Sequence, residues 1–242
     1  EQETIESNAA QSTEQKDQTS NSEDKDSILT LETEFFNKIE VINQVPTITN
    51  PDNVLVLVNK EFALPADYYP QDLVRPNVTF AFGNQDIEKS YMRKEAAQAL
   101  EEMFQAAQKE GIEILATSGF RSYDTQNFLF QQEVESVGAE NAELAVALPG
   151  KSEHQTGLTM DITAESVGGL LTEEFENTEE GQWLASHAHQ YGFILRYPKG
   201  KEAITGYQYE PWHFRYVGKE TAAILAENDW TLEEYFENVE KI

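Results

Sequence analysis

The chain contains only four histidines, and one of them lies in a short stretch with an aspartate and a glycine. In SEHQTGLTMDIT (152–163), His154 and Asp161 are seven residues apart, with Gly157 between them. A loop that turns at the glycine and leads into a strand could direct both side chains to one point. Imidazole and carboxylate are common ligands of transition metals, but two ligands do not make a metal site.

A second stretch supplies what the first one lacks. In YEPWHFRYVG (209–218), Glu210 and His213 are three residues apart and are flanked by aromatic residues that could form a dry wall. Together with His154 and Asp161, they complete a His, Asp, His set with a spare carboxylate. This is the composition of a catalytic zinc site, which needs three protein ligands and a base for the proton of the attacking water.

Each of these residues also has an ordinary structural interpretation. An isolated histidine beside a tryptophan is usually a satisfied core or surface residue, and an isolated aspartate often ends a strand. His187 and His189 fit this ordinary interpretation, because they lie in an ordinary amphipathic helical pattern that offers no comparable set of neighbouring ligands. We expect His187 to pack in the core and His189 to be solvated. The joint pattern of the other two histidines favours the metal site.

Composition limits the class of metal site and the class of partner. The 242 residues include no cysteine, so any metal must be held by His, Asp or Glu. The formal net charge of −27 would repel phosphates, which excludes nucleic acid and anionic membrane surfaces as partners. No apolar run approaches the roughly 20 residues that cross a bilayer.

Hydrophobic periodicity predicts the elements that must position these residues. The regions that we expect to be helical are 88–110, 122–138, 139–148, 179–192, 219–227 and 231–240. The regions that we expect to be strands are 54–60, 112–118, 158–163, 193–197 and one strand or a pair within 204–218. The sequence therefore predicts an α+β fold, a single compact domain with a mostly antiparallel sheet flanked by helices.

The N-terminal part of the chain differs in composition from the rest. Residues 1–27 are almost entirely polar or acidic, which is typical of a disordered tether. We interpret residues 28–52 as a linker or edge segment and residues 53–242 as the catalytic domain. The chain starts at Glu1 rather than at methionine, so we expect that a signal peptide or membrane anchor was trimmed from it.

Three blocks of the sequence, in this order, carry a resemblance to a known family. The blocks SGFRSYDTQ (118–126), SEHQTGLTMDIT and EPWHFRYVG resemble the signatures of the VanY-like D-alanyl carboxypeptidases. Within this family, the chain is most similar to the LdcB-type L,D-carboxypeptidases. The resemblance covers roughly residues 50–242. It implies a zinc peptidase with the fold shared by D,D-peptidases and the Hedgehog signalling domain.

The resemblance also implies a role for each matching residue. The zinc ligands would be His154, Asp161 and His213, with Glu210 as the general base that takes the proton of the attacking water. Arg121 would face the substrate, where a guanidinium can pair with a terminal carboxylate or a developing oxyanion. The residues expected to line the substrate pocket beside Arg121 are Gln126, Ser152, Tyr123 and Trp212.

The substrate that the resemblance implies is the stem peptide of peptidoglycan. The sequence of residues 57–74 resembles the L,D subgroup, which removes D-alanine from tetrapeptide stems, and so favours this reaction. The alternatives are a D,D-carboxypeptidase acting on pentapeptide ends and a non-catalytic, zinc-stabilised cell-wall binding module. We expect a monomer at the bacterial cell surface or in the cell wall. Thr159 stands where many similar sequences have alanine, and the sequence gives no reason for it.

Overall fold

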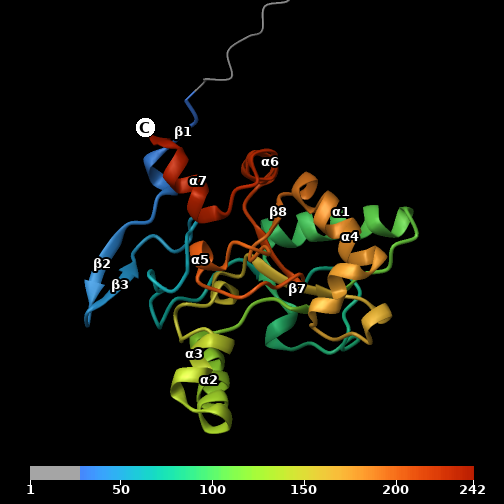
Figure 1. The fold of residues 1–242 in the computed structure, drawn as a ribbon, viewed down its shortest axis with the longest axis horizontal. Coiled ribbons are helices and arrows are strands. Elements are labelled where there is room, and N and C mark those ends of the chain that lie inside the picture. The colour runs from blue at the N-terminus through green and yellow to red at the C-terminus, as the bar shows by residue number, and fades with distance from the viewer. Residues whose placement is uncertain (1–27) are drawn as a thin grey trace, which may run out of the picture.

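The computed structural model describes residues 28–242, and the predicted tether, residues 1–27, lies outside the described residues. At its centre is a four-stranded sheet (Figure 1). Its strands, in spatial order, are β6 (Leu115–Ser118), β7 (Thr159–Thr163), β9 (His213–Tyr216) and β8 (Phe193–Leu195). Every neighbouring pair in this sheet is antiparallel, which confirms the predicted α+β fold class.

Helices surround this sheet, and three further pairs of strands lie outside it. The helices are α1 (Lys94–Lys109), α2 (Tyr123–Val137), α3 (Ala139–Ala145), α4 (Glu179–His187), α5 (Glu202–Thr205), α6 (Lys219–Asn228) and α7 (Leu232–Asn238). The 3₁₀ helices are η1 (Thr33–Phe35), η2 (Glu88–Ser90), η3 (Glu153–Thr156), η4 (Glu165–Val167), η5 (Glu173–Asn177) and η6 (Ala188–Tyr191). The outer strand pairs are β1 (Thr30–Leu31) with β10 (Glu240–Lys241), β2 (Ile39–Ile42) with β3 (Val45–Ile48), and β4 (Leu73–Val74) with β5 (Met92–Arg93).

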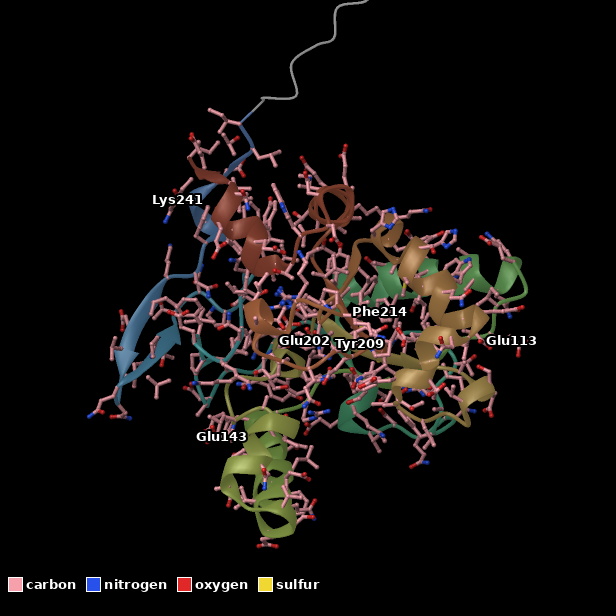
Figure 2. The ribbon with its side chains drawn as sticks, in the orientation of Figure 1. Glu113, Glu143, Glu202, Tyr209, Phe214 and Lys241 are labelled. Carbon is pink, nitrogen blue, oxygen red and sulfur yellow. The ribbon has the colours of Figure 1, made fainter. Side chains whose placement is uncertain are left out.

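The main core lies between the sheet and helices α1 and α4. The apolar face of α1 buries Leu100 and Met103 completely, and β7 contributes Met160 and Ile162 to the same cluster. Helices α2 and α3 form a hairpin that stands apart from this core in Figure 1. In Figure 2, Phe214 of β9 lies near the centre of the molecule, whereas Glu143 marks the outlying α2–α3 hairpin.

The helix termini follow the capping rules that predicted them. The Ser122 side chain accepts a hydrogen bond from the Thr125 amide at the start of α2, and Gly138 follows the helix with a φ of 82°. Thr231 and Glu234 form a capping box at the start of α7. These local signals explain why most of the expected helices lie where the sequence predicts them.

The strand predicted at residues 54–60 is wrong. The segment is buried, as its apolar content suggested, but it runs through turns and forms no strand. Its carbonyl groups are instead satisfied by a side chain, because Arg215 donates through Nη2 to the oxygens of Val54 and Val56 at 3.0 and 2.8 Å. A buried guanidinium thus replaces the neighbouring strand that the pattern predicted.

Two other element predictions need correction. The helix expected to begin at residue 88 begins at Lys94, because η2 and then β5 occupy the preceding residues; Met92 is buried from β5. The region 204–218 contains one strand, β9, and no pair, because its first residues end the short helix α5.

Residues 28–52 form β1, η1 and the β2–β3 hairpin. Strand β1 pairs in parallel with β10, so the two ends of the described chain lie side by side; Lys241 of β10 is labelled beside the N-terminal strand in Figure 2. The boundaries predicted at residues 27 and 52 stay predictions. None of the helices within residues 28–242 is long and apolar enough to span a bilayer.

Candidate active site

The sheet register brings two of the three predicted metal ligands together. Asp161 of β7 pairs with His213 at the start of β9, and both side chains are buried. Nδ1 of His213 lies 3.2 Å from Oδ1 of Asp161. Antiparallel pairing therefore joins residues that are far apart in the sequence.

A tight turn delivers the third ligand. His154 lies in η3, which ends at Gly157 in the left-handed region with a φ of 68°. A Cβ at Gly157 would come within 2.9 Å of the Leu73 side chain, so both conformation and space require glycine here. Nε2 of His154 reaches Oδ2 of Asp161 at 3.4 Å. The chain thus turns at Gly157, as its sequence suggested.

Hydrogen bonds from outside the triad orient both imidazoles. Nδ1 of His154 lies 2.7 Å from the carbonyl oxygen of Gly119, which can only accept, so Nδ1 carries the proton and Nε2 offers its lone pair. Burial lowers the pKa of His154. Nε2 of His213 lies 3.4 Å from Oε2 of Glu153, which leaves Nδ1 facing Asp161.

The arrangement fits a divalent metal. One ligand atom each from His154, Asp161 and His213 can be chosen so that all three lie within 4.8 Å of one another. Oδ1 of Asp161 is buried and has no hydrogen-bond partner among the described residues, although an unpaired buried carboxylate oxygen is costly. Two nitrogens and one carboxylate oxygen match the ligand set of catalytic zinc sites.

The charge state of the triad is consistent with a cation site. Burial would raise the pKa of Asp161, but the neighbouring His154 and His213 outweigh it and hold the pKa well below its usual range. Burial opposes the charged form of His213, yet the neighbouring carboxylates of Asp161 and Glu153 raise its pKa to about 9. Nδ1 of His213 must therefore lose its proton before this nitrogen can bind a metal.

The spare carboxylate, Glu210, faces the same histidine. Oε2 of Glu210 lies 3.4 Å from Nδ1 of His213, and its side chain keeps 27% exposure. Burial raises the pKa of Glu210 to about 7, against the lowering effect of His213 and Arg121. A carboxylate with this pKa can both take and return a proton near neutral pH.

Arg121 is held in place by polar contacts. Its Nη1 donates to Oε1 of Gln126 at 2.9 Å, and its Nη2 donates to Oγ of Ser118 at 3.2 Å. Burial lowers the pKa of Arg121, while Asp161 and Glu210 act in the opposite direction. Gln126 is itself almost fully buried, and its Nε2 donates to the carbonyl of Ala147. The amide of Gln126 is therefore engaged in holding the guanidinium.

A pocket of about 350 Å³ connects these groups. Its lining includes the triad together with Glu210, Arg121, Gln126, Ser152, Trp212 and two tyrosines, Tyr197 and Tyr207. One wall comes from α2 and the residues after α3, so the pocket lies between the α2–α3 hairpin and the sheet. Tyr123 does not line this pocket; its ring lies beside Gly150. His187, which we expected in the core, is only partly buried and stacks on Trp183 away from the pocket.

Comparisons with known proteins identify the family. The family model "VanY: D-alanyl-D-alanine carboxypeptidase" matches residues 89–219, which is more than half of the chain. The chain belongs to the VanY family. It is therefore an enzyme of the carboxypeptidase class, and the predicted resemblance is confirmed.

Individual relatives of this VanY-family chain agree with the assignment. YodJ of Bacillus subtilis (strain 168) is 54% identical over 94% of this chain and 81% of its own length. A solved structure of the LdcB LD-carboxypeptidase, described in terms of peptidoglycan recognition, is 55% identical, with a TM-score of 0.86, and covers 88% of this chain and all of the other. A vancomycin-resistance D,D-pentapeptidase VanY mutant with Zn(II) is 32% identical, with a TM-score of 0.60, over 76% of this chain and 98% of its own.

The sequence analysis missed a group of buried charges behind the triad of this VanY-family chain. Oε1 of Glu153 accepts hydrogen bonds from Arg196 and Arg215, both at 2.7 Å, and Arg196 also pairs with Glu233 of α7. We call these four residues the Arg–Glu ladder. Burial would raise the pKa of Glu153, but the two guanidiniums hold it well below its usual range. Charged residues in a sequence normally indicate a solvated surface. Only the position of Glu153 next to His154 could have indicated that these charged residues are buried beside the triad.

Proposed function

We propose that this chain is a zinc-dependent L,D-carboxypeptidase that removes the C-terminal D-alanine from tetrapeptide stems of peptidoglycan. The observation that carries the proposal is the convergence of a His, Asp, His cluster, Glu210 and Arg121 on one pocket. A bound zinc would polarise the carbonyl of the scissile peptide bond and lower the pKa of a water beside it.

The residues of the chain supply the other parts of the reaction. Glu210 takes the proton of the attacking water and returns it to the amine of the leaving D-alanine, as its position beside His213 and its pKa of about 7 allow. Arg121, held by Gln126 and Ser118, binds the terminal carboxylate or stabilises the developing oxyanion. Trp212 and Ser152 line the pocket in which the end of the peptide lies.

Two relatives bear on the bond that is cut. The L,D-carboxypeptidase LdcB shares 55% identity and a TM-score of 0.86 with this chain, against 32% and 0.60 for the D,D-pentapeptidase VanY. This difference favours the L,D reaction over the alternative, removal of D-alanine from pentapeptide ends. A site of action at the bacterial cell surface follows from the same substrate, and a monomer stays our expectation.

The decisive experiment is mass spectrometry of defined muropeptides incubated with the purified chain and zinc. Tetrapeptide and pentapeptide stems are treated with the wild type and with Glu210→Ala, and zinc content is measured for both. We expect the wild type to release D-alanine from the tetrapeptide and the variant to retain zinc without turnover. Shortening of the pentapeptide alone would establish the D,D reaction instead. Zinc binding without any turnover by the wild type would indicate a binding module.

A further inference from the structure

The Arg–Glu ladder connects the metal site to a helix outside the family-model match. Glu233 lies in α7, beyond residues 89–219, and its side chain is almost fully buried. Both of its carboxylate oxygens accept hydrogen bonds from Arg196, at 2.7 and 2.8 Å. Oε1 also accepts one from Asn59 at 3.3 Å. This bidentate geometry fixes both the position and the plane of the guanidinium.

The fixed guanidinium in turn determines which oxygen of Glu153 is free. The third donor of Arg196, Nε, and Nη1 of Arg215 both reach Oε1 of Glu153 at 2.7 Å. Neither arginine donates to Oε2, which faces Nε2 of His213 at 3.4 Å. The ladder thus reserves one carboxylate oxygen for the metal-ligating histidine.

We propose that Glu233 is a positioning residue for the metal site, acting through Arg196 and Glu153 on the orientation of His213. The inference rests on the proposed zinc function. Glutamine at position 233 offers one acceptor oxygen instead of two, so one terminal nitrogen of Arg196 loses its acceptor, and Glu153 is the carboxylate that Arg196 already contacts. The guanidinium then competes with His213 for Oε2.

Loss of the negative charge of Glu233 also weakens zinc binding. The ladder holds two guanidiniums and two carboxylates, so it is neutral as a unit when all four are ionised. Loss of the Glu233 charge leaves one uncompensated positive charge among side chains that are fully buried, next to a site for a dication. Both effects weaken zinc binding in Glu233→Gln.

The chain offers a matched control on the same helix. Glu234 is the next residue, forms an ion pair with Lys201 at 3.0 Å and accepts from the Thr231 amide, but has no contact with the ladder. Glu234→Gln therefore removes a carboxylate and an ion pair from α7 without touching the route to His213. A purely structural role of Glu233 would make the two variants differ in stability alone.

The test measures zinc affinity of the metal-free full chain by competition with a chromogenic chelator. We expect Glu233→Gln to bind zinc about tenfold more weakly than the wild type, as is typical for partners behind metal ligands, and Glu234→Gln to bind like the wild type. The visible absorption bands of the Co²⁺-loaded protein, which report ligand geometry, should change in Glu233→Gln only. Equilibrium urea unfolding of the metal-free proteins separates these changes from lost stability.

Arg196→Lys provides a second variant if Glu233→Gln fails to fold. Lysine keeps the charge but cannot hold Glu153 and Glu233 with one planar fork, so the same weakening of zinc binding is expected. Wild-type affinity and an unchanged Co²⁺ spectrum in whichever variant folds would overturn the inference. Absence of zinc binding by the wild type would instead overturn the proposed function, so the two failures are distinguishable.

Discussion

Replacement of Glu153 by glutamine should destabilise the metal-free protein strongly. The Glu153 carboxylate, Arg196 and Arg215 are all fully buried, and two charged hydrogen bonds of 2.7 Å converge on Oε1. Hydrogen bonds to charged groups contribute about 1.5–3 kcal/mol each, and breaking a buried ion pair on one side costs about 3–5 kcal/mol. Glutamine keeps an acceptor oxygen but not the charge, so we expect a loss of about 4 kcal/mol in the free energy of unfolding.

The measurement is equilibrium urea unfolding in the presence of a chelator, followed by tryptophan fluorescence. Glu234→Gln is the control, because its ion pair with Lys201 is partly solvated and its cap of Thr231 is local. We expect the control to lose about 1 kcal/mol. A loss in Glu153→Gln no larger than that of the control would refute the reasoning that the ladder is a buried, charge-balanced unit.

The pH dependence gives a second check on the same variant. Because the pKa of Glu153 is depressed in the folded chain, its stabilising contribution is present above the unfolded-state pKa and is lost as the pH falls through the folded-state pKa. The difference between wild type and Glu153→Gln should therefore shrink as the pH falls below about 4.3, the unfolded-state pKa of glutamate. It should also decline above about pH 6.5, because the Glu153 carboxylate helps to raise the pKa of His213 to about 9. A difference that grows as the pH falls below about 4 would contradict this assignment of the charge.

Four further outcomes are expected. Gly157→Ala should lose about 2 kcal/mol in urea unfolding, because alanine must adopt a φ of 68° and its Cβ meets Leu73. Arg121→Lys should raise the KM for the tetrapeptide stem about tenfold or more with a smaller change in kcat, because one ammonium cannot replace the fork that Gln126 and Ser118 position. Chelation should abolish D-alanine release and lower the thermal midpoint, and about one equivalent of zinc should restore both. Thr159→Val should leave stability unchanged or raise it by about 1 kcal/mol in thermal melts, because the buried Oγ1 has no partner within the described part of the chain.

The cluster of His154, Asp161 and His213 could be predicted because it depends on histidine, a residue type that is rare in this chain. Two of the four histidines stand near an acidic residue at short spacing, and the structure places both in one cluster with Asp161. Most helices could be predicted for a similar reason, since Ser122 and Gly138 mark the two ends of α2 by their own conformational preferences. These signals are local, so they survive without knowledge of the fold.

What could not be predicted depends on contacts between distant segments. Residues 54–60 have the composition of a buried strand, but side chains, those of Arg215 and Asn37, pair with their backbone in place of another strand. Nothing near Arg215 in the sequence shows that Glu153 compensates its charge. A pattern of hydrophobicity gives the burial of a segment, whereas the groups that satisfy its backbone are known only from the tertiary structure.

Hydrogen bonds that orient the two histidines of the candidate site connect the three sequence blocks. Gly119, in the first block, provides the carbonyl that orients His154 in the second, and its close approach to the Tyr91 carbonyl leaves no room for a side chain. Glu153, in the second block, provides the oxygen that orients His213 in the third. The first and second blocks therefore each supply the hydrogen-bond acceptor for a proposed metal ligand in the block that follows. A change in one block would disturb a histidine that lies in another. SEHQTGLTMDIT therefore predicts a metal site only together with the other two blocks.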